Sequence, residues 1–347
     1  MIKKSKAKKD FPSELRMDLV SEDWVVIASG RAKRPKTFKN KERKRIIISS
    51  RECPFCQIQT QRKPTLIFSN GKRFPPEKGI PSDWTTIVIP NKYPAFIPGD
   101  SLDETVEGGL YKKMNAVGFH EIVVTRDHNK SLAQFPLVRA KEVFDAYHDR
   151  YLSLMKEKFV NYISIFHNHG LEAGASQPHP HSQIMTTPLI DGDLRSALLT
   201  SQRYYKKNRK CAYCEMSKWE RKIKERIVFE NKDFLVICPF ASKFMFQVII
   251  SPKKHSPYFE RITEKEKVSL AEAFQKALSK LYNVFDDPAY NFYLHTAPCD
   301  NKNYDYYHWH WTIIPKTSTW AGFEIGTGME ISTIKPEEAA RYLRKQK

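Results

Sequence analysis

Hydrophobic and polar positions along this chain follow a succession of patterns that occurs twice. An apolar run with strand-like composition stands at 85–96, and a second one stands at 226–241. Each is followed by another β-like run that ends in a histidine, "HEIVVTRDH" at His128 and "FQVIISPKKH" at His255. Both successions are therefore predicted to begin with neighbouring strands.

A helix-like stretch follows each pair of runs. Apolar residues recur three and four positions apart in 263–282, and 137–156 is its counterpart in the first half of the chain. Thr263 and Glu266 form the S/T-x-x-E pattern of a capping box, which predicts that the second helix begins there. One long helix is thus expected in each half.

After each helix come a strand, "NYISIFHN" or "NFYLHTAP", and then a His-x-His pair. Three landmarks repeat at nearly constant spacing: His128 to His255 at 127 residues, Asn161 to Asn291 at 130, and His179 to His308 at 129. A near-constant offset indicates duplication. We therefore expect an α+β fold of two tandem halves, with antiparallel sheet and flanking helices, divided into residues 1–196 and 197–347.

The chain of 347 residues carries 58 Lys and Arg against 39 Asp and Glu, a net charge of +19. Such an excess favours polyanionic partners, either nucleic acid or phosphorylated small molecules. Much of the charge lies in four runs: Lys3 to Lys9, Lys39 to Arg45, Tyr205 to Lys210, and Lys218 to Arg226. No run approaches the roughly 20 apolar residues that cross a membrane, and no secretory signal begins the chain. We expect a cytoplasmic protein.

Two C-x-x-C pairs, each followed by a spaced histidine and a His-x-His, predict two tetrahedral metal sites. Each set is complete without an open position, which predicts two structural zinc ions per chain. The first set is Cys53, Cys56, His128 and His179, and the second is Cys211, Cys214, His255 and His308.

Alternatives to these metal sites stay open at the level of sequence. Each cysteine pair could be a reduced, metal-free turn. His120 competes with His128 as a ligand of the first set, although the spacing to His255 favours His128. The remaining histidines near these segments are interpreted as ordinary polar residues: His148, His167 and His169.

The segment "NHGLEAGASQPHPHSQ", which starts at Asn168, has the composition of a phosphate-handling site. Small residues from Gly174 to Ser176 allow backbone N–H groups to approach a phosphate. If His179 binds metal, its carbonyl could orient His181, and an oriented neutral imidazole can attack phosphorus. Gln183 could then donate a hydrogen bond to a phosphate oxygen. The alternative is a buried histidine pair in which both residues bind metal.

At these residues the chain resembles the galactose-1-phosphate uridylyltransferase family of the histidine-triad superfamily. Further segments carry the resemblance along nearly the whole chain: "ELRMDLVSEDWVVIASGRAKRP", "NKYPAF", "GFHEIVV", "DHNKSL", "YYHWHWTIIP" and "AGFEIGTG". The most specific is "HPHSQ", because transferases of this superfamily carry glutamine where the hydrolases carry a third histidine. The resemblance implies two histidine-triad-like halves and a nucleotidyl group carried on His181.

The resemblance also implies roles for individual residues. Ser176 and Gln183 would hold phosphate oxygens beside His181, with Asn168 nearby. The other implied contacts to the nucleotide sugar are Arg31, Arg34, Asn91, Gly174, Gly322, Phe323 and Glu324. Without the motif, Arg31 and Arg34 would be surface charges, and Glu324 would cap a turn. Members of this family build the active site between protomers, which implies a homodimer.

Three functions follow as hypotheses. The first is ping-pong transfer of a uridylyl group from UDP-glucose to galactose 1-phosphate through His181. The second keeps the fold and changes the substrate to ADP-glucose, with inorganic phosphate as acceptor. The third is a zinc-dependent nucleic-acid-binding protein. Against it, the cysteine pairs lack the closely spaced partners of finger modules, so only weak nonspecific binding is expected.

Overall fold

The computed structural model describes residues 13–31 and 48–346. Arg34 lies outside these ranges, as do the basic runs at Lys3 to Lys9 and Lys39 to Arg45. Within the described ranges, every helix is too short or too polar to cross a membrane.

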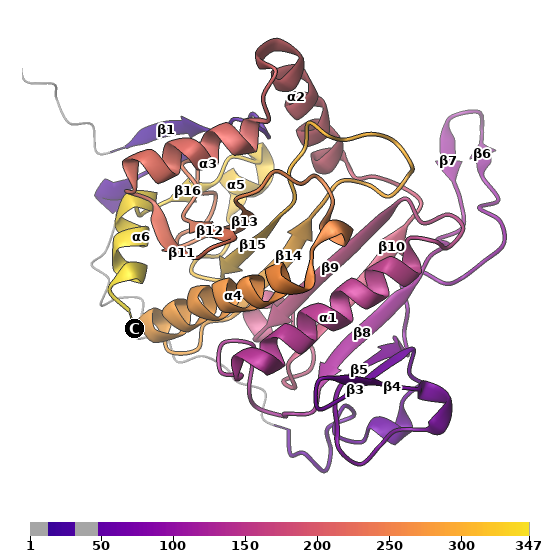
Figure 1. The fold of residues 1–347 in the computed structure, drawn as a ribbon. Coiled ribbons are helices and arrows are strands. Elements are labelled where there is room, and N and C mark those ends of the chain that lie inside the picture. Colours follow the sequence, from indigo (N-terminus) through magenta and orange to yellow (C-terminus); the bar gives the residue numbers. More distant parts are fainter. Residues whose placement is uncertain (1–12, 32–47, 347) are drawn as a thin grey trace, which may run out of the picture.

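An eleven-stranded antiparallel sheet runs through the molecule in the order β11-β12-β13-β15-β14-β9-β10-β8-β5-β3-β4 (Figure 1). The first-half strands are β3 (Leu66–Ser69), β4 (Lys72–Phe74), β5 (Trp84–Pro90), β8 (His120–Thr125), β9 (Tyr162–His169) and β10 (His181–Thr187). The second-half strands are β11 (Ile227–Glu230), β12 (Phe234–Ile237), β13 (Val248–Pro252), β14 (Tyr290–His295) and β15 (His310–Pro315). Strands β9 and β14 pair with each other and join the halves into one sheet.

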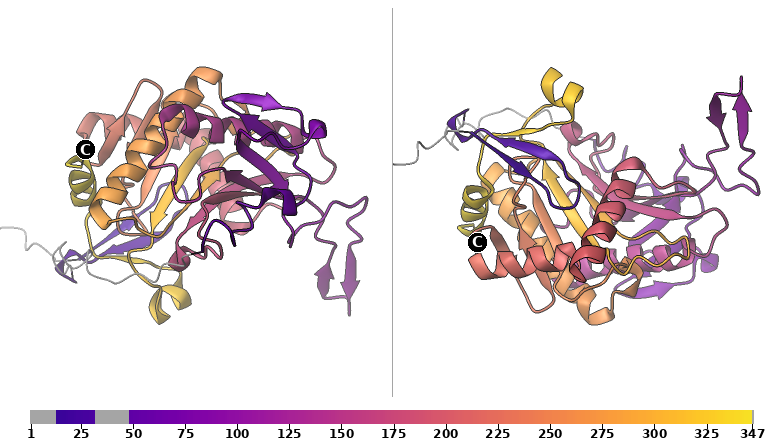
Figure 2. Two further views of the ribbon diagram at one scale, coloured as in Figure 1. Left: turned by 90° about the horizontal axis from the view of Figure 1, so that it is seen from below. Right: turned by 90° about the horizontal axis from the view of Figure 1, so that it is seen from above.

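Two long helices, α1 (Leu137–Leu154) and α4 (Glu264–Phe285), lie side by side across one face of the sheet (Figures 1 and 2). The expected capping box starts α4, because Thr263 accepts from the backbone N–H of Glu266 and the Glu266 carboxylate accepts from that of Thr263. Both helix predictions are confirmed to within three residues at each end.

The topology confirms the duplicated α+β architecture. The strand registers correct one of the three landmarks of the sequence repeat, the pair Asn161 and Asn291. His310 pairs with His295, while continuing the β9–β10 register by one residue brings His181 opposite Asn168. The counterpart of Asn168 is therefore His295. Asn291 does not correspond to Asn161, as the sequence spacing suggested, but pairs directly with Asn168 across the junction of the halves. The sequence repeat could not show this pairing, because strand register is set by three-dimensional neighbours.

The remaining elements lie around this sheet. A small sheet is formed by β1 (Glu14–Met17), β2 (Trp24–Ile27) and β16 (Ile331–Ser332), and a projecting hairpin by β6 (Thr105–Glu107) and β7 (Tyr111–Lys113) (Figure 2). The other helices are α2 (Gly192–Asn208), α3 (Ala212–Ile223), α5 (Gly322–Thr327) and α6 (Pro336–Arg344). The expected boundary between residues 196 and 197 falls inside α2, and it stays a prediction.

The core between the helices and the sheet is continuous across both halves. Phe274 on α4 is fully buried and contacts the ring of Phe144 on α1, with centroids 4.9 Å apart. It also meets Phe292 of β14 and Trp311 of β15 at 5.3 Å each. One aromatic side chain therefore joins both long helices to the centre of the sheet.

We predict that Phe274→Ala lowers the free energy of unfolding by about 3–5 kcal/mol, because it leaves a cavity that three fixed rings cannot fill. Val268→Ala, on the exposed side of the same helix at 43% exposure, should change it by less than about 0.5 kcal/mol. Urea denaturation of both variants measures the difference. Equal effects would show that α4 does not depend on this contact.

Candidate active site and metal clusters

The first cysteine pair and its two histidines come together at one end of the first-half strands. Cys53 Sγ lies 3.4 Å from His179 Nδ1, and Cys56 Sγ lies 3.2 Å from His128 Nδ1. His120, the competing ligand, is not among the clustered residues. The four expected side chains therefore form one Cys₂His₂ group, and His128 is the histidine that joins it.

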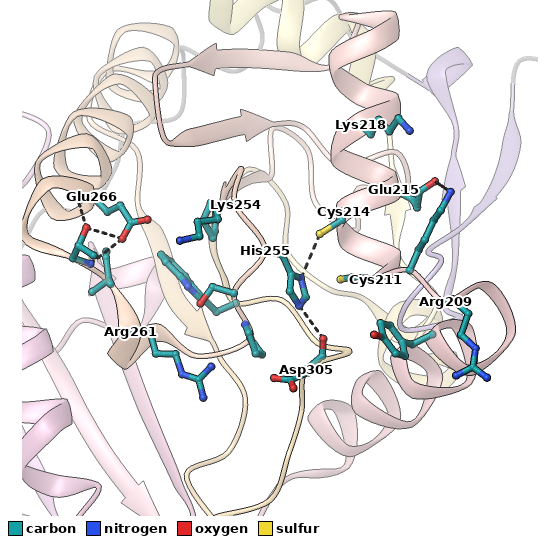
Figure 3. A pocket seen from close by; sticks show the side chains of 18 residues that line it. Arg209, Cys211, Cys214, Glu215, Lys218, Lys254, His255, Arg261, Glu266 and Asp305 are labelled. Carbon is teal, nitrogen blue, oxygen red and sulfur yellow. Dashed lines mark hydrogen bonds and ion pairs between the residues drawn. The ribbon is translucent and has the colours of Figure 1, made fainter.

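The second set forms an equivalent group. Cys214 Sγ lies 3.4 Å from His255 Nδ1 and 3.5 Å from His308 Nδ1, and Cys211 completes the cluster. Figure 3 shows Cys211, Cys214 and His255 of this group. In each group the ligand atoms all lie within 4.8 Å of one another.

In all four histidines, Nε2 hydrogen-bonds a backbone carbonyl, and this leaves Nδ1, the nitrogen that faces the cysteines, able to bind a metal. The Nε2–H of His179 donates to the Thr125 carbonyl at 2.7 Å, and that of His308 donates to the Pro252 carbonyl at 2.9 Å. His128 and His255 likewise donate to carbonyls. A carbonyl can only accept, so each Nδ1 keeps its lone pair. The sulfur–nitrogen separations match the edge of about 3.6 Å expected for a zinc tetrahedron. Both groups are therefore fitted to hold a metal ion.

His181 lies beside the first cluster, at the start of β10. Its Nδ1–H donates to the carbonyl of His179 at 2.9 Å, so the lone pair is on Nε2. The side chain is 8% exposed and packs against the ring of Phe55 at 4.9 Å. Burial lowers the pKa of His181 below its usual value, although the bond to the His179 carbonyl opposes this. The imidazole is therefore neutral near pH 7, with Nε2 available as a nucleophile.

His181 and Gln183 point to the sheet face that the long helices leave open. Their neighbour Ser182 points the other way and hydrogen-bonds Tyr147 of α1 at 2.5 Å. Since successive strand residues alternate between faces, the side chains of His181 and Gln183 lie on the opposite face from α1. We call this the site face.

Gln183 is oriented by His120, a contact that the sequence interpretation missed. The backbone N–H of Ala95 donates to His120 Nδ1 at 3.2 Å, which places the ring proton on Nε2. That Nε2–H donates to Gln183 Oε1 at 2.7 Å. The amide oxygen of Gln183 is thereby occupied, and its NH₂ group is left to face a ligand. Asn91 Nδ2 lies 2.9 Å from the same His120 nitrogen. Both atoms carry hydrogen in this tautomer, so the contact is not a hydrogen bond, but it places this expected residue at the site.

Asn168 is oriented from the second half of the chain. Its Oδ1 accepts from Asn291 Nδ2 at 2.8 Å, and the same Asn291 group donates to the Ala173 carbonyl. The NH₂ group of Asn168 therefore stays available, and the loop before His179 is tied to β14. Gly170, which starts this loop, has φ +82°, and a Cβ there would lie 2.7 Å from Ala289. Only glycine fits this approach.

Only some of the other expected site residues lie near the first cluster. Gly174 and Ser176 lie in the exposed loop that leads to His179. Arg31 ends a 3-10 turn, Ser29–Arg31, and Arg34 lies outside the described residues. Gly322, Phe323 and Glu324 form the exposed helix α5, which lies beside the small sheet (Figure 1). Glu324 accepts from the backbone N–H of Ala321 at 3.1 Å, the capping role named as its alternative.

The second half repeats the imidazole geometry but not the small residues Gly174 to Ser176. His310 donates from Nδ1 to the His308 carbonyl at 3.1 Å, and it stacks on His295 at 4.7 Å. His295 and His310 line a hollow of about 1480 Å³ on the site face, and this hollow extends to Asn168. By the spacing of the repeat, Asn303 to Asp305 stand where the first half has Gly174 to Ser176, and Thr312 replaces Gln183. Asp305 thus places a carboxylate where the first half has the hydroxyl of Ser176.

Two family profiles together cover nearly all of the chain. The profile described as "Galactose-1-phosphate uridyl transferase, N-terminal domain" matches residues 3–191, and the profile of the C-terminal domain matches residues 198–345. An ADP-glucose phosphorylase from Arabidopsis thaliana is 32% identical over 95% of this chain and 92% of its own length. A galactose-1-phosphate uridylyltransferase from Thermotoga maritima is 29% identical over 95% of this chain and 98% of its own length.

Solved structures show the same likeness. The ADP-glucose phosphorylase from Arabidopsis thaliana with bound ADP-glucose superposes with a TM-score of 0.79 at 30% identity, covering 96% of this chain and 99% of that one. A uridylyltransferase structure superposes with a TM-score of 0.72 at 26% identity, covering 95% and 97%. The fold, the full-length matches and the paired profiles agree. The chain therefore belongs to the galactose-1-phosphate uridyl transferase family.

Proposed function

We propose that this chain transfers a nucleotidyl group from a nucleotide sugar to a phosphorylated acceptor in two steps through His181, with UDP-glucose as donor and galactose 1-phosphate as acceptor. The observation that carries the proposal is the state of His181. Its Nδ1–H is held by the His179 carbonyl, and its Nε2 is left as the nucleophilic atom. The family assignment supports the substrate class.

In the first step, the Nε2 lone pair of His181 attacks the α-phosphorus of the nucleotide sugar. A phosphorus–nitrogen bond forms, and the bond to the bridging oxygen breaks, so that sugar 1-phosphate leaves with the electron pair. In the second step, a phosphate oxygen of the acceptor attacks the same phosphorus, and the imidazole leaves as a neutral group. Covalent catalysis replaces one difficult displacement by two easier ones.

Charge on the phosphate oxygens increases in both steps, and the site offers neutral donors for it. Gln183 and Asn168 have their amide oxygens occupied by His120 and Asn291, so their NH₂ groups are suited to donate. Ser176 and the backbone at Gly174 complete the donor set in this proposal. Asn91 contacts the nucleoside, and the remaining nucleotide-sugar contacts come from Arg31, Arg34, Gly322, Phe323 and Glu324.

We propose zinc for both clusters, because two thiolates and two imidazoles are its preferred donors. When bound, the ion supplies a rigid tetrahedral anchor. In the first half the anchored residue is His179, whose carbonyl fixes the tautomer and the direction of His181. In the second half the anchor is structural only.

We also propose that the protein is a homodimer in which α5 of one copy contacts the site of the other. Phe323 and Ile325 are 48% and 70% exposed, which leaves them free for such a contact. All six cysteines are described and free, which fits the reducing cytoplasm that we propose as its location. The net charge supports only weak nonspecific nucleic-acid binding.

A second candidate is phosphorolysis of ADP-glucose, in which an adenylyl group passes from His181 to inorganic phosphate. The Arabidopsis relative with this name matches 95% of this chain over 92% of its own length. The same nucleophile and donor set serve both reactions, so only the base and the acceptor differ.

A pulse-chase experiment tests these proposals. The protein is incubated without acceptor with UDP-glucose or ADP-glucose labelled at the α-phosphorus, and then chased with galactose 1-phosphate or inorganic phosphate. Label from UDP-glucose that moves to galactose 1-phosphate supports the first proposal. Label only from ADP-glucose, released by phosphate, favours the second. Absence of protein-bound label from both donors would refute the covalent mechanism.

We predict that His181→Gly lowers kcat by more than about 1000-fold, because the covalent route is lost. The fold should persist, since His181 is not in the metal cluster. His310→Gly is the matched control, because His310 has the same imidazole geometry but lies in the half that does not repeat Gly174 to Ser176. Transfer should persist in this variant. Comparable losses in both variants would contradict the assignment of the nucleophile.

We predict that His120→Phe lowers kcat by about 10- to 100-fold and leaves KM nearly unchanged, because Gln183 loses the bond that directs its amide. His120→Gln should restore most of the rate, since its amide N–H can donate to the same oxygen. The test is the steady-state kcat and KM of both variants. Equal activity of the Phe and Gln variants would show that His120 only fills space.

We predict two metal ions per chain by elemental analysis, and one in each of Cys53→Ser and Cys214→Ser. Transfer should fall much further in Cys53→Ser, because only the first cluster holds the residue that orients His181. The unfolding midpoint, measured in parallel, separates loss of fold from loss of orientation. Unchanged metal content, or equal loss of transfer in the two folded variants, would contradict this account.

A further inference from the structure

Two of the basic runs in the sequence meet at a second hollow, away from His181. This hollow has a volume of about 670 Å³ and lies beside the second metal cluster, between the end of α2, the start of α3 and the loop after β13 (Figure 3). Its charged lining comprises five basic side chains and three acidic ones: Arg209, Lys210, Lys218, Lys254, Arg261, Glu215, Glu266 and Asp305.

The three acidic side chains are already engaged. Glu266 accepts hydrogen bonds in the capping box of α4, from the backbone N–H and the hydroxyl of Thr263. The Asp305 carboxylate accepts from Asn303 at 2.9 Å. Glu215 lies 3.9 Å from Lys210, at the limit of an ion pair. The donors to Glu266 and Asp305 are neutral and leave their charges in place, so the three carboxylates offset three of the five positive charges and the lining keeps an excess of two.

The basic side chains are not matched in the same way. Among the described residues, Arg209, Lys218 and Lys254 form no ion pair with a carboxylate, and the Arg261 guanidinium lies over the Tyr258 ring at 4.1 Å. Figure 3 shows Lys254 and Arg261 on one side of His255, and Lys218 and Arg209 on the other side. Like charges gathered around one hollow repel one another, and an anion with several charged points removes that cost.

Charge balance within the second Cys₂His₂ cluster does not explain these basic side chains. A divalent ion held by two thiolates and two neutral imidazoles has no net charge. The first cluster provides an internal comparison, because Asp127 precedes His128 where Lys254 precedes His255. The same cluster geometry thus forms with an acidic neighbour in one half and a basic neighbour in the other. The basic lining is specific to the second half.

We propose that this hollow binds a compact chain of phosphates, such as a linear triphosphate or the triphosphate part of a nucleotide. Because the cations lie on both sides of His255, several linked phosphates match their distribution better than a single phosphate does. The volume falls in the range of about 300–1,000 Å³ typical of small-molecule sites. A nucleic acid would instead need a basic stripe along an extended surface. The site is separate from the transfer reaction and does not rest on it.

Calorimetric titration of the full-length, metal-loaded protein with inorganic triphosphate tests this proposal. Lys218→Glu combined with Lys254→Glu should weaken binding at least tenfold. Lys72→Glu is the control for reversal of one lysine charge at an exposed position, on β4 at the opposite edge of the sheet. Transfer activity should stay unchanged in both proteins. Metal content is measured before and after titration, since triphosphate itself binds divalent ions.

Three results would overturn the proposal. Absence of millimolar or tighter binding to the unaltered protein would show that no such site exists. Equal binding by the double variant and the Lys72→Glu control would place triphosphate elsewhere, for example at the catalytic loop. Loss of single-stranded DNA binding in the double variant, with triphosphate binding intact, would assign the basic lining to nucleic acid. If the double variant loses metal, Lys218→Gln combined with Lys254→Gln repeats the test with a milder change.

Discussion

The site depends on three contacts made by one residue, His179. Its Nδ1 faces the cysteines of the first cluster, its Nε2–H donates to the Thr125 carbonyl, and its own carbonyl accepts from His181. A ligand held at both ring nitrogens cannot rotate, so its carbonyl is a fixed point. Through this carbonyl, the Cys₂His₂ group sets the tautomer of His181. Geometry fixed before the reaction is what nucleophilic catalysis at phosphorus requires.

Duplication explains why this arrangement occurs twice, and divergence explains why one copy is proposed to be catalytic. His308 and His310 repeat the bonds of His179 and His181. The second half, however, carries Asp305 where the first has Ser176. The halves also depend on each other, because Asn291 orients Asn168 across the β9–β14 junction. One sheet thus combines a site in the first half with support from the second.

Much of this was predictable from sequence because ligands at fixed spacing and amphipathic periodicity are local signals. They predicted both Cys₂His₂ sets, the two long helices and the His179–His181 bond. The orienting roles of His120 and Asn291 were not predictable, since both arise where strands distant in sequence meet. The only hint in the sequence was that His120 begins a strand-like run. Its pairing with β10 became visible only in the structure.

The His179 carbonyl holds Nδ1 of His181, and we propose that Nε2 therefore carries the nucleotidyl group. Trapping the intermediate and mapping it by tandem mass spectrometry identifies the modified residue. Phosphorus–proton correlation spectra of the same adduct then distinguish the two ring nitrogens. This account predicts phosphorus on Nε2 of His181. An adduct on Nδ1, or on any other residue, would contradict it.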